Sequence, residues 1–197
     1  MLVALLASTN LLYHFPMLFA VIEHTVTTGD TAGEPITSAA FRGLIVQPAI
    51  LSRATHFILA AIAMCGVMLL GYALRLRRRK ADEADVQCVA AWGAQIALLP
   101  SLAQIPVGLW LTASLSAPLQ SAVTGNDLIS TLLLLGSIGL AIWMLQTLAA
   151  IAIGDSQRGK LIKAMVLMVV VITLMSGVLQ RLRSLGVQQV AAESAEG

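Results

Sequence analysis

The sequence predicts an all-α protein, a polytopic membrane bundle of about five transmembrane helices. The chain has 197 residues, of which 58% are hydrophobic and 11% charged, and its mean hydropathy is +0.87. A soluble domain carries roughly 25% charged residues, so this composition excludes an ordinary soluble protein. Five runs are long enough to cross a hydrocarbon core, which takes roughly 20 apolar residues. They cover residues 2–22, 46–74, 88–113, 127–153 and 161–182.

The first run follows Met1 directly, without the basic segment and the small-residue cleavage site of a signal peptide. We therefore expect residues 2–22 to be retained as the first span. The helical bundle is expected to occupy residues 1–185, and residues 186–197 are expected to form a short polar tail.

The loops between the runs predict an orientation. The second loop, RLRRRKADEAD, has five basic and three acidic residues, and the fourth, GDSQRGKLIK, has three basic ones. The third loop, SLSAPLQSAVTGND, has no basic residue. Because positive charge marks the cytoplasmic side, we expect an N-in, C-out protein, multi-pass in the bacterial inner membrane. Arg181 and Arg183, at the outer end of the last run, fit this rule poorly.

Two of the three histidines lie inside apolar runs. His14 lies eight residues before Ile22, where the first run ends, and His56 lies eight residues after Pro48, near the start of the second. At about 1.5 Å per residue, both imidazoles are expected roughly 12 Å below the outer surface, level with each other. Two imidazoles at one depth on consecutive antiparallel helices suit the two axial ligands of a haem iron.

Arg53 supports this interpretation. It lies three residues before His56, on the same face of the predicted helix and one turn nearer the outer surface. There its guanidinium could pair with the propionates of a haem that His56 holds. Thr55 and Tyr13 are candidates for fixing the orientation of the imidazole rings. The alternative is that the histidines only hydrogen-bond a neighbouring helix and serve packing.

The remaining polar and small residues of the runs receive simpler predictions. His24, at the outer interface, is expected to be solvated or to cap a helix, with metal ligation as the alternative. Cys65 and Cys88 lack CxxC or CxxCH spacing, which argues against a disulfide framework, a zinc site and a covalently attached haem. Gly136 and Gly139 predict a close approach of two helices.

The segment LIVQPAILSRATHFILAAIAMCGVMLLGYALRLRRR resembles the haem-binding helix of the cytochrome bd oxidase large subunit. In that helix an Asn-Pro pair precedes a basic residue and then the haem-binding histidine, and Gln47, Pro48, Arg53 and His56 keep this spacing. The LLYHF around His14 is similar to the first helix of that subunit, whose histidine binds a second haem. The resemblance implies a cut-down relative, because the carboxylates of the oxygen-reducing site and the long quinol-binding loop are missing.

Two functional hypotheses follow. The first is a b-type cytochrome subunit with one or two haems b in the outer half of the bilayer. It would pass electrons between a quinone pool and a periplasmic c-type cytochrome or iron–sulfur protein, as part of a larger redox complex and not as a complete enzyme. The second is a cofactor-free structural or assembly subunit of a membrane complex. In the oxidase the corresponding histidines bind different haems, so the resemblance implies separate irons for His14 and His56. Their matched depth favours one shared iron.

Overall fold

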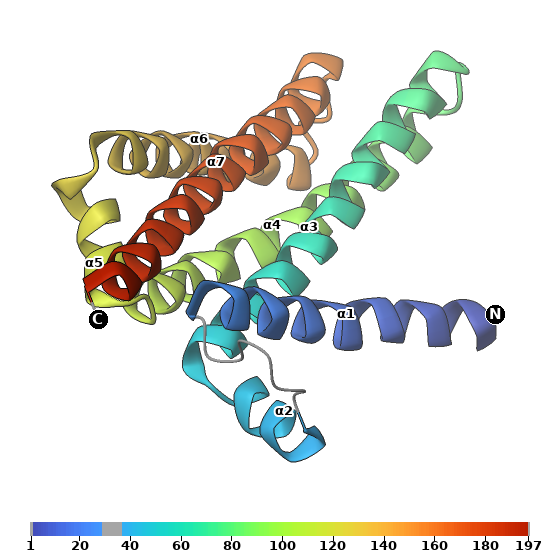
Figure 1. The fold of residues 1–197 in the computed structure, drawn as a ribbon. Helices are drawn as coiled ribbons and strands as arrows, with labels where there is room; N and C mark the ends of the chain where they lie inside the picture. Colours follow the sequence, from blue (N-terminus) through green and yellow to red (C-terminus); the bar gives the residue numbers. More distant parts are fainter. Residues whose placement is uncertain (1, 29–36, 197) are drawn as a thin grey trace. The chain divides into compact units, whose positions relative to one another are not determined.

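The computed structural model describes residues 2–28 and 37–196, which form helices and turns without any strand (Figure 1). The elements, in chain order, are α1 (Leu2–Thr28), α2 (Ser38–Ile45), α3 (Pro48–Arg78), α4 (Glu83–Ala113), α5 (Ala117–Ser121), the π-helical turn η1 (Ala122–Asn126), α6 (Leu128–Ala152) and α7 (Arg158–Glu196).

Among the described residues, five helices are long and apolar enough to cross a membrane, which confirms the all-α, multi-pass prediction. These spans are Leu5–Val26, Pro48–Arg78, Glu83–Ala113, Leu128–Ala152 and Arg158–Gln188. The N-in, C-out orientation stays a prediction.

The helices extend beyond the apolar runs that predicted them. The apolar run at 46–74 is followed by basic residues, yet α3 continues through them to Arg78. Similarly, α7 continues through residues 186–196, where we expected a polar tail, and ends at Glu196. Arginine, glutamine, glutamate and alanine all favour helix, so a helix can continue where the hydropathy has already fallen. The division into a bundle and a tail stays a prediction.

Two short elements lie in stretches that the sequence predicts as loops. Before α2, the hydroxyl of Thr37 accepts a hydrogen bond from the backbone N–H of Ala40, at 3.3 Å, and so caps the helix. In η1, Gly125 has φ 143°, a conformation that residues with a side chain rarely adopt. This glycine allows the chain to turn from α5 into α6.

The chain divides into two compact units. The first combines residues up to 58 with residues 106–128 and those from 179 onward. The second combines residues 59–105 and 129–178. Helices α3, α4 and α7 therefore contribute to both units, and each unit is described here by itself.

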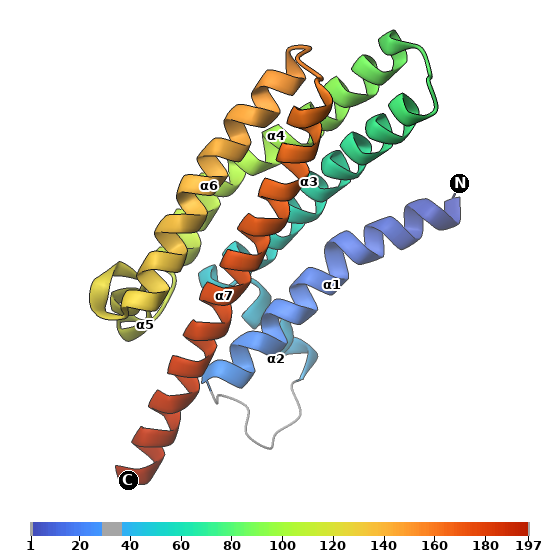
Figure 2. The same cartoon turned by 90° about the horizontal axis from the view of Figure 1, so that it is seen from above.

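The second unit is a four-helix arrangement, in which parts of α3, α4, α6 and α7 run lengthwise beside one another (Figure 2). All four helices contribute to one apolar core, and the buried residues that α4 adds to it are three alanines and Val86. The fully buried members of this core are Leu70, Ala73, Val86, Ala90, Ala94, Ala97, Leu148, Ile151, Leu161 and Ala164.

Two glycines of the second unit let α3 and α4 come together. A Cβ atom on Gly66 would lie 2.4 Å from the backbone nitrogen of Ala97 and 2.5 Å from the carbonyl oxygen of Gly93. A Cβ atom on Gly93 would lie 2.9 Å from the carbonyl oxygen of Gly66. The backbones of α3 and α4 are therefore in direct contact at these glycines. Such packing through small residues is typical of membrane helices.

The first unit has a smaller apolar core, where α1 meets the beginning of α3. Ala20 and Val21 of α1 are buried against Ile50 and Ala54 of α3, and side chains of α2 such as Phe41 pack onto this cluster. In the N-terminal half of α1 most described side chains are exposed.

Candidate functional site

A buried carboxylate lies at the centre of the first unit. Glu23, in the last two turns of α1, is 7% exposed and pairs with arginines from two other helices. Its Oε2 lies 3.4 Å from an η nitrogen of Arg53 in α3, and its Oε1 accepts a hydrogen bond of 2.9 Å from Nε of Arg183 in α7. We call these three residues the Glu23 triad. It joins helices that are far apart in the sequence.

A second ion pair lies in the same unit. Arg181 donates through Nε and an η nitrogen to the two carboxylate oxygens of Asp127, both at 3.2 Å. This is the parallel, two-bond geometry of an arginine and a carboxylate. Arg181 and Arg183 are two positions apart, so they leave α7 in directions roughly 160° apart. One end of α7 therefore joins the α1 segment on one side and the beginning of α6 on the other.

The triad changes the predicted role of Arg53. The sequence predicts a guanidinium ready to pair with a haem propionate, but in the structure it already faces Glu23. Two arginines and one glutamate give the triad a formal charge of +2 − 1 = +1. One positive charge is therefore left over for an anionic group, within one helical turn of His56.

His56 lies around α3 from the residues that contact Glu23 and Phe19 of α1. Arg53 and Phe57 contact Glu23 and Phe19 of α1, and the ring centroids of the two phenylalanines are 5.9 Å apart. At 100° per residue, His56 lies roughly 60° around the helix from Arg53 and roughly 100° from Phe57. Its side chain is half-buried.

The contacts between α1 and α3 also relate the positions of His14 and His56 along the two helices, whereas their equal depth in the membrane stays a prediction. The contacts Glu23–Arg53 and Phe19–Phe57 fix one antiparallel register, since four steps along α1 match four steps along α3. In this register the position level with His56 is Ala20, six residues from His14, which corresponds to about 9 Å along the helix. The equal depth predicted from the sequence assumes that each helix enters the membrane where its apolar run begins or ends.

The other predicted site residues are distributed along the same two helices. His14 is exposed on α1 and His24 is half-buried near its end. The hydroxyl of Thr55 donates to the carbonyl oxygen of Leu51 at 2.7 Å, so only its lone pairs remain for an imidazole N–H. The side chain of Tyr13 lies outside the described residues.

A haem site requires an axial imidazole for the iron and a positive charge near the propionates. Within the described residues, no group of three or more His, Cys, Asp or Glu could hold a metal ion by itself. A haem iron takes only one or two protein ligands. His56 with the Glu23 triad fits one such ligand and one propionate, and a single iron shared by His14 and His56 stays a prediction.

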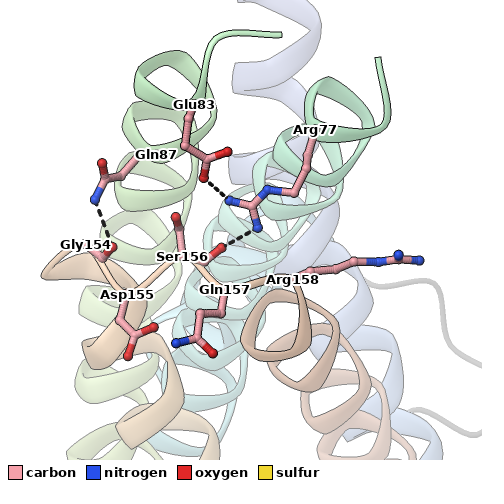
Figure 3. Close-up of a pocket in the computed structure, with 8 residues that line it drawn as sticks. All are labelled: Arg77, Glu83, Gln87, Gly154, Asp155, Ser156, Gln157 and Arg158. Carbon is pink, nitrogen blue, oxygen red and sulfur yellow. Dashed lines mark hydrogen bonds and ion pairs between the residues drawn. The ribbon is translucent and has the colours of Figure 1, made fainter. Parts of the chain in front are cut away.

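A polar pocket of about 540 Å³ lies in the second unit, where the loops α3–α4 and α6–α7 meet (Figure 3). Arg77 pairs with Glu83 and donates to the carbonyl oxygen of Ser156 at 2.8 Å. The side-chain amide of Gln87 donates to the carbonyl oxygen of Gly154 at 2.9 Å. These bonds tie the two loops together, which indicates a structural role.

The sequence analysis did not identify Glu23 and Asp127 as partners of arginines. A signal was present, since Arg181 and Arg183 break the expected charge pattern at the end of the last run. Arginines in that position need acidic partners nearby. Comparisons of the chain with protein-family models, with curated proteins and with solved structures found no match.

Proposed function

We propose that this chain is a b-type cytochrome subunit that passes electrons between a quinone pool and a redox partner. The observation that carries the proposal is an imidazole half-buried in a membrane-spanning helix, one turn from an arginine group with a net positive charge. Ionisable side chains inside spans are costly and usually mark functional sites. The resemblance of residues 44–79 to a haem-binding helix supports the same function.

In this proposal His56 would supply an axial nitrogen and the Glu23 triad would hold a propionate. A bound haem b would supply reversible one-electron transfer, and the protein would set its potential through ligand, charge and burial. Glu23 fixes the position of Arg53, and Arg183 contributes the second positive charge. The offset of about 9 Å along α1 between His14 and the position level with His56 favours two irons, as the oxidase resemblance implies, with His14 serving the second.

We further propose that the protein is oriented N-in, C-out in a bacterial inner membrane. The exposed basic residues that follow α3 support a cytoplasmic position for that loop. The Glu23 triad would then lie toward the periplasmic side, where a c-type cytochrome or an iron–sulfur protein could accept electrons. A chain with so little mass outside its spans suits a subunit of a larger complex.

The test is a pyridine haemochrome spectrum of the purified protein and its histidine variants. We expect two haems b per chain in the wild type, one in His56→Ala and one in His14→Ala. His24→Ala is the matched control, because it removes an imidazole near Glu23 and should retain both haems. Loss of all haem in either variant would indicate a shared iron and contradict the geometry. A protein without haem would instead support the cofactor-free structural subunit.

A further inference from the structure

The exposed face of α3 in the second unit has an apolar part and a basic part. Ala61, Cys65, Met68, Tyr72, Arg75 and Arg79 are all exposed and recur every three or four residues. At 100° per residue they lie within roughly 80° of one another, so they form one stripe along the helix. Met68 is 67% and Tyr72 50% exposed. The stripe is apolar along most of its length and carries two guanidinium groups at its end.

The arginines at this end of α3 have different roles. Arg77 lies on the opposite side of the helix, where it pairs with Glu83 and donates to Ser156 (Figure 3). This contact holds the end of α3 in place. The backbone N–H of Arg79 still donates to the carbonyl oxygen of Arg75, at 3.1 Å, so Arg79 continues the helical geometry and stays on the stripe.

We propose that this stripe binds an anionic phospholipid, with the phosphate between Arg75 and Arg79 and an acyl chain along Tyr72, Met68 and Cys65. The charge of the two arginines is complementary to a phosphodiester, and arginine recognises phosphate oxygens with two parallel hydrogen bonds. Tyr72 lies about one turn before Arg75 in α3, a height at which its hydroxyl would suit the ester region. The stripe from Met68 to Arg79 spans about 16 Å, roughly the depth of one leaflet.

A zwitterionic lipid lacks the net charge that two arginines would attract, and inorganic phosphate lacks the chain that Met68 and Tyr72 would cover. A basic cluster directly after a span is the usual feature for recognition of anionic lipids. The proposal depends only on the membrane location and does not depend on haem.

The experiment is a titration of detergent-solubilised protein with phosphatidylglycerol, followed by native mass spectrometry, with phosphatidylcholine and inorganic phosphate as separate arms. We expect preferential binding of one phosphatidylglycerol, and a loss of affinity of about 30-fold in Arg75→Gln/Arg79→Gln. Tyr72→Ala should weaken phosphatidylglycerol binding and leave phosphate competition unchanged. These positions are exposed, so the melting temperature of each variant should match the wild type.

Arg158→Gln is the control, because it removes an exposed charge from the same loop region outside the stripe. An equal loss of affinity in Arg158→Gln would show a general charge effect and overturn the proposal. So would equal binding of phosphatidylcholine. Displacement of the lipid by millimolar inorganic phosphate would assign the site to free phosphate and would overturn the acyl-chain part.

Discussion

In the first unit, helix segments are joined by Glu23 and Asp127, which pair with arginines of α7 and α3. In the second unit the corresponding contacts are made by alanines, glycines and branched apolar side chains. Small residues allow two membrane helices to approach at little cost, whereas buried charges are costly to keep in an apolar environment. The two units are therefore held together by different interactions, ion pairs in the first and close apolar packing in the second.

Glu23→Gln should have the largest effect on stability, because it leaves two guanidinium groups facing a neutral amide. Removing one partner of a buried ion pair costs roughly 3–5 kcal/mol, and we expect about 3 kcal/mol, since Arg183 is partly exposed. Trp110 lies in the first unit and Trp143 in the second. In variants that keep only one of these tryptophans, the fluorescence change during denaturant unfolding follows one unit at a time. Glu23→Gln should move the Trp110 transition to a lower denaturant concentration.

The control is Glu83→Gln, the same substitution at a carboxylate that is 68% exposed and pairs with Arg77 in the second unit. An exposed pair contributes roughly 0–1 kcal/mol, so the Trp143 transition should barely move. Equal shifts in the two variants would mean that burial does not distinguish the two ion pairs.

Gly66→Ala should have the next largest effect, this time in the second unit. The new Cβ would lie 2.4 Å from a backbone nitrogen, and a rigid backbone cannot give way as a flexible side chain does. Overpacking of this kind costs about 1–3 kcal/mol. The Trp143 transition should shift to lower denaturant, and the Trp110 transition should not. If the Trp143 transition of Gly66→Ala stayed at the denaturant concentration of the wild type, α3 and α4 would not be in close contact.

The fold and the site differ in how much of them could be predicted from sequence. The five spans follow from hydropathy, which depends on residues within one segment. The Glu23–Arg183 contact joins residues 160 positions apart, and no local pattern contains it. The face and depth of His56 likewise depend on how α1 packs on α3. Sequence could place the histidine in a membrane helix, but the neighbours of its side chain depend on tertiary packing.

Arg181→Gln should have a smaller effect than either preceding change. Arg181 is 40% exposed and Asp127 19% exposed, so water can replace part of the lost pairing. We expect a small shift of the Trp110 transition, and no further shift when Arg181→Gln is added to Asp127→Asn. Additive losses in this double-mutant cycle would indicate that the two side chains do not stabilise the first unit as a pair.

Gly136→Ala should have the smallest effect, and it separates the sequence prediction from the structure. The sequence predicts close helix packing at Gly136 and Gly139, which would make an added methyl group destabilising. In the structure a Cβ at either position meets no atom within 4 Å, and both residues are exposed. Alanine is also a better helix former than glycine, by up to about 1 kcal/mol. The Trp143 transition should therefore stay in place or move to slightly higher denaturant. A loss comparable with that of Gly66→Ala would mean that another helix, from this chain or a partner subunit, covers this face of α6.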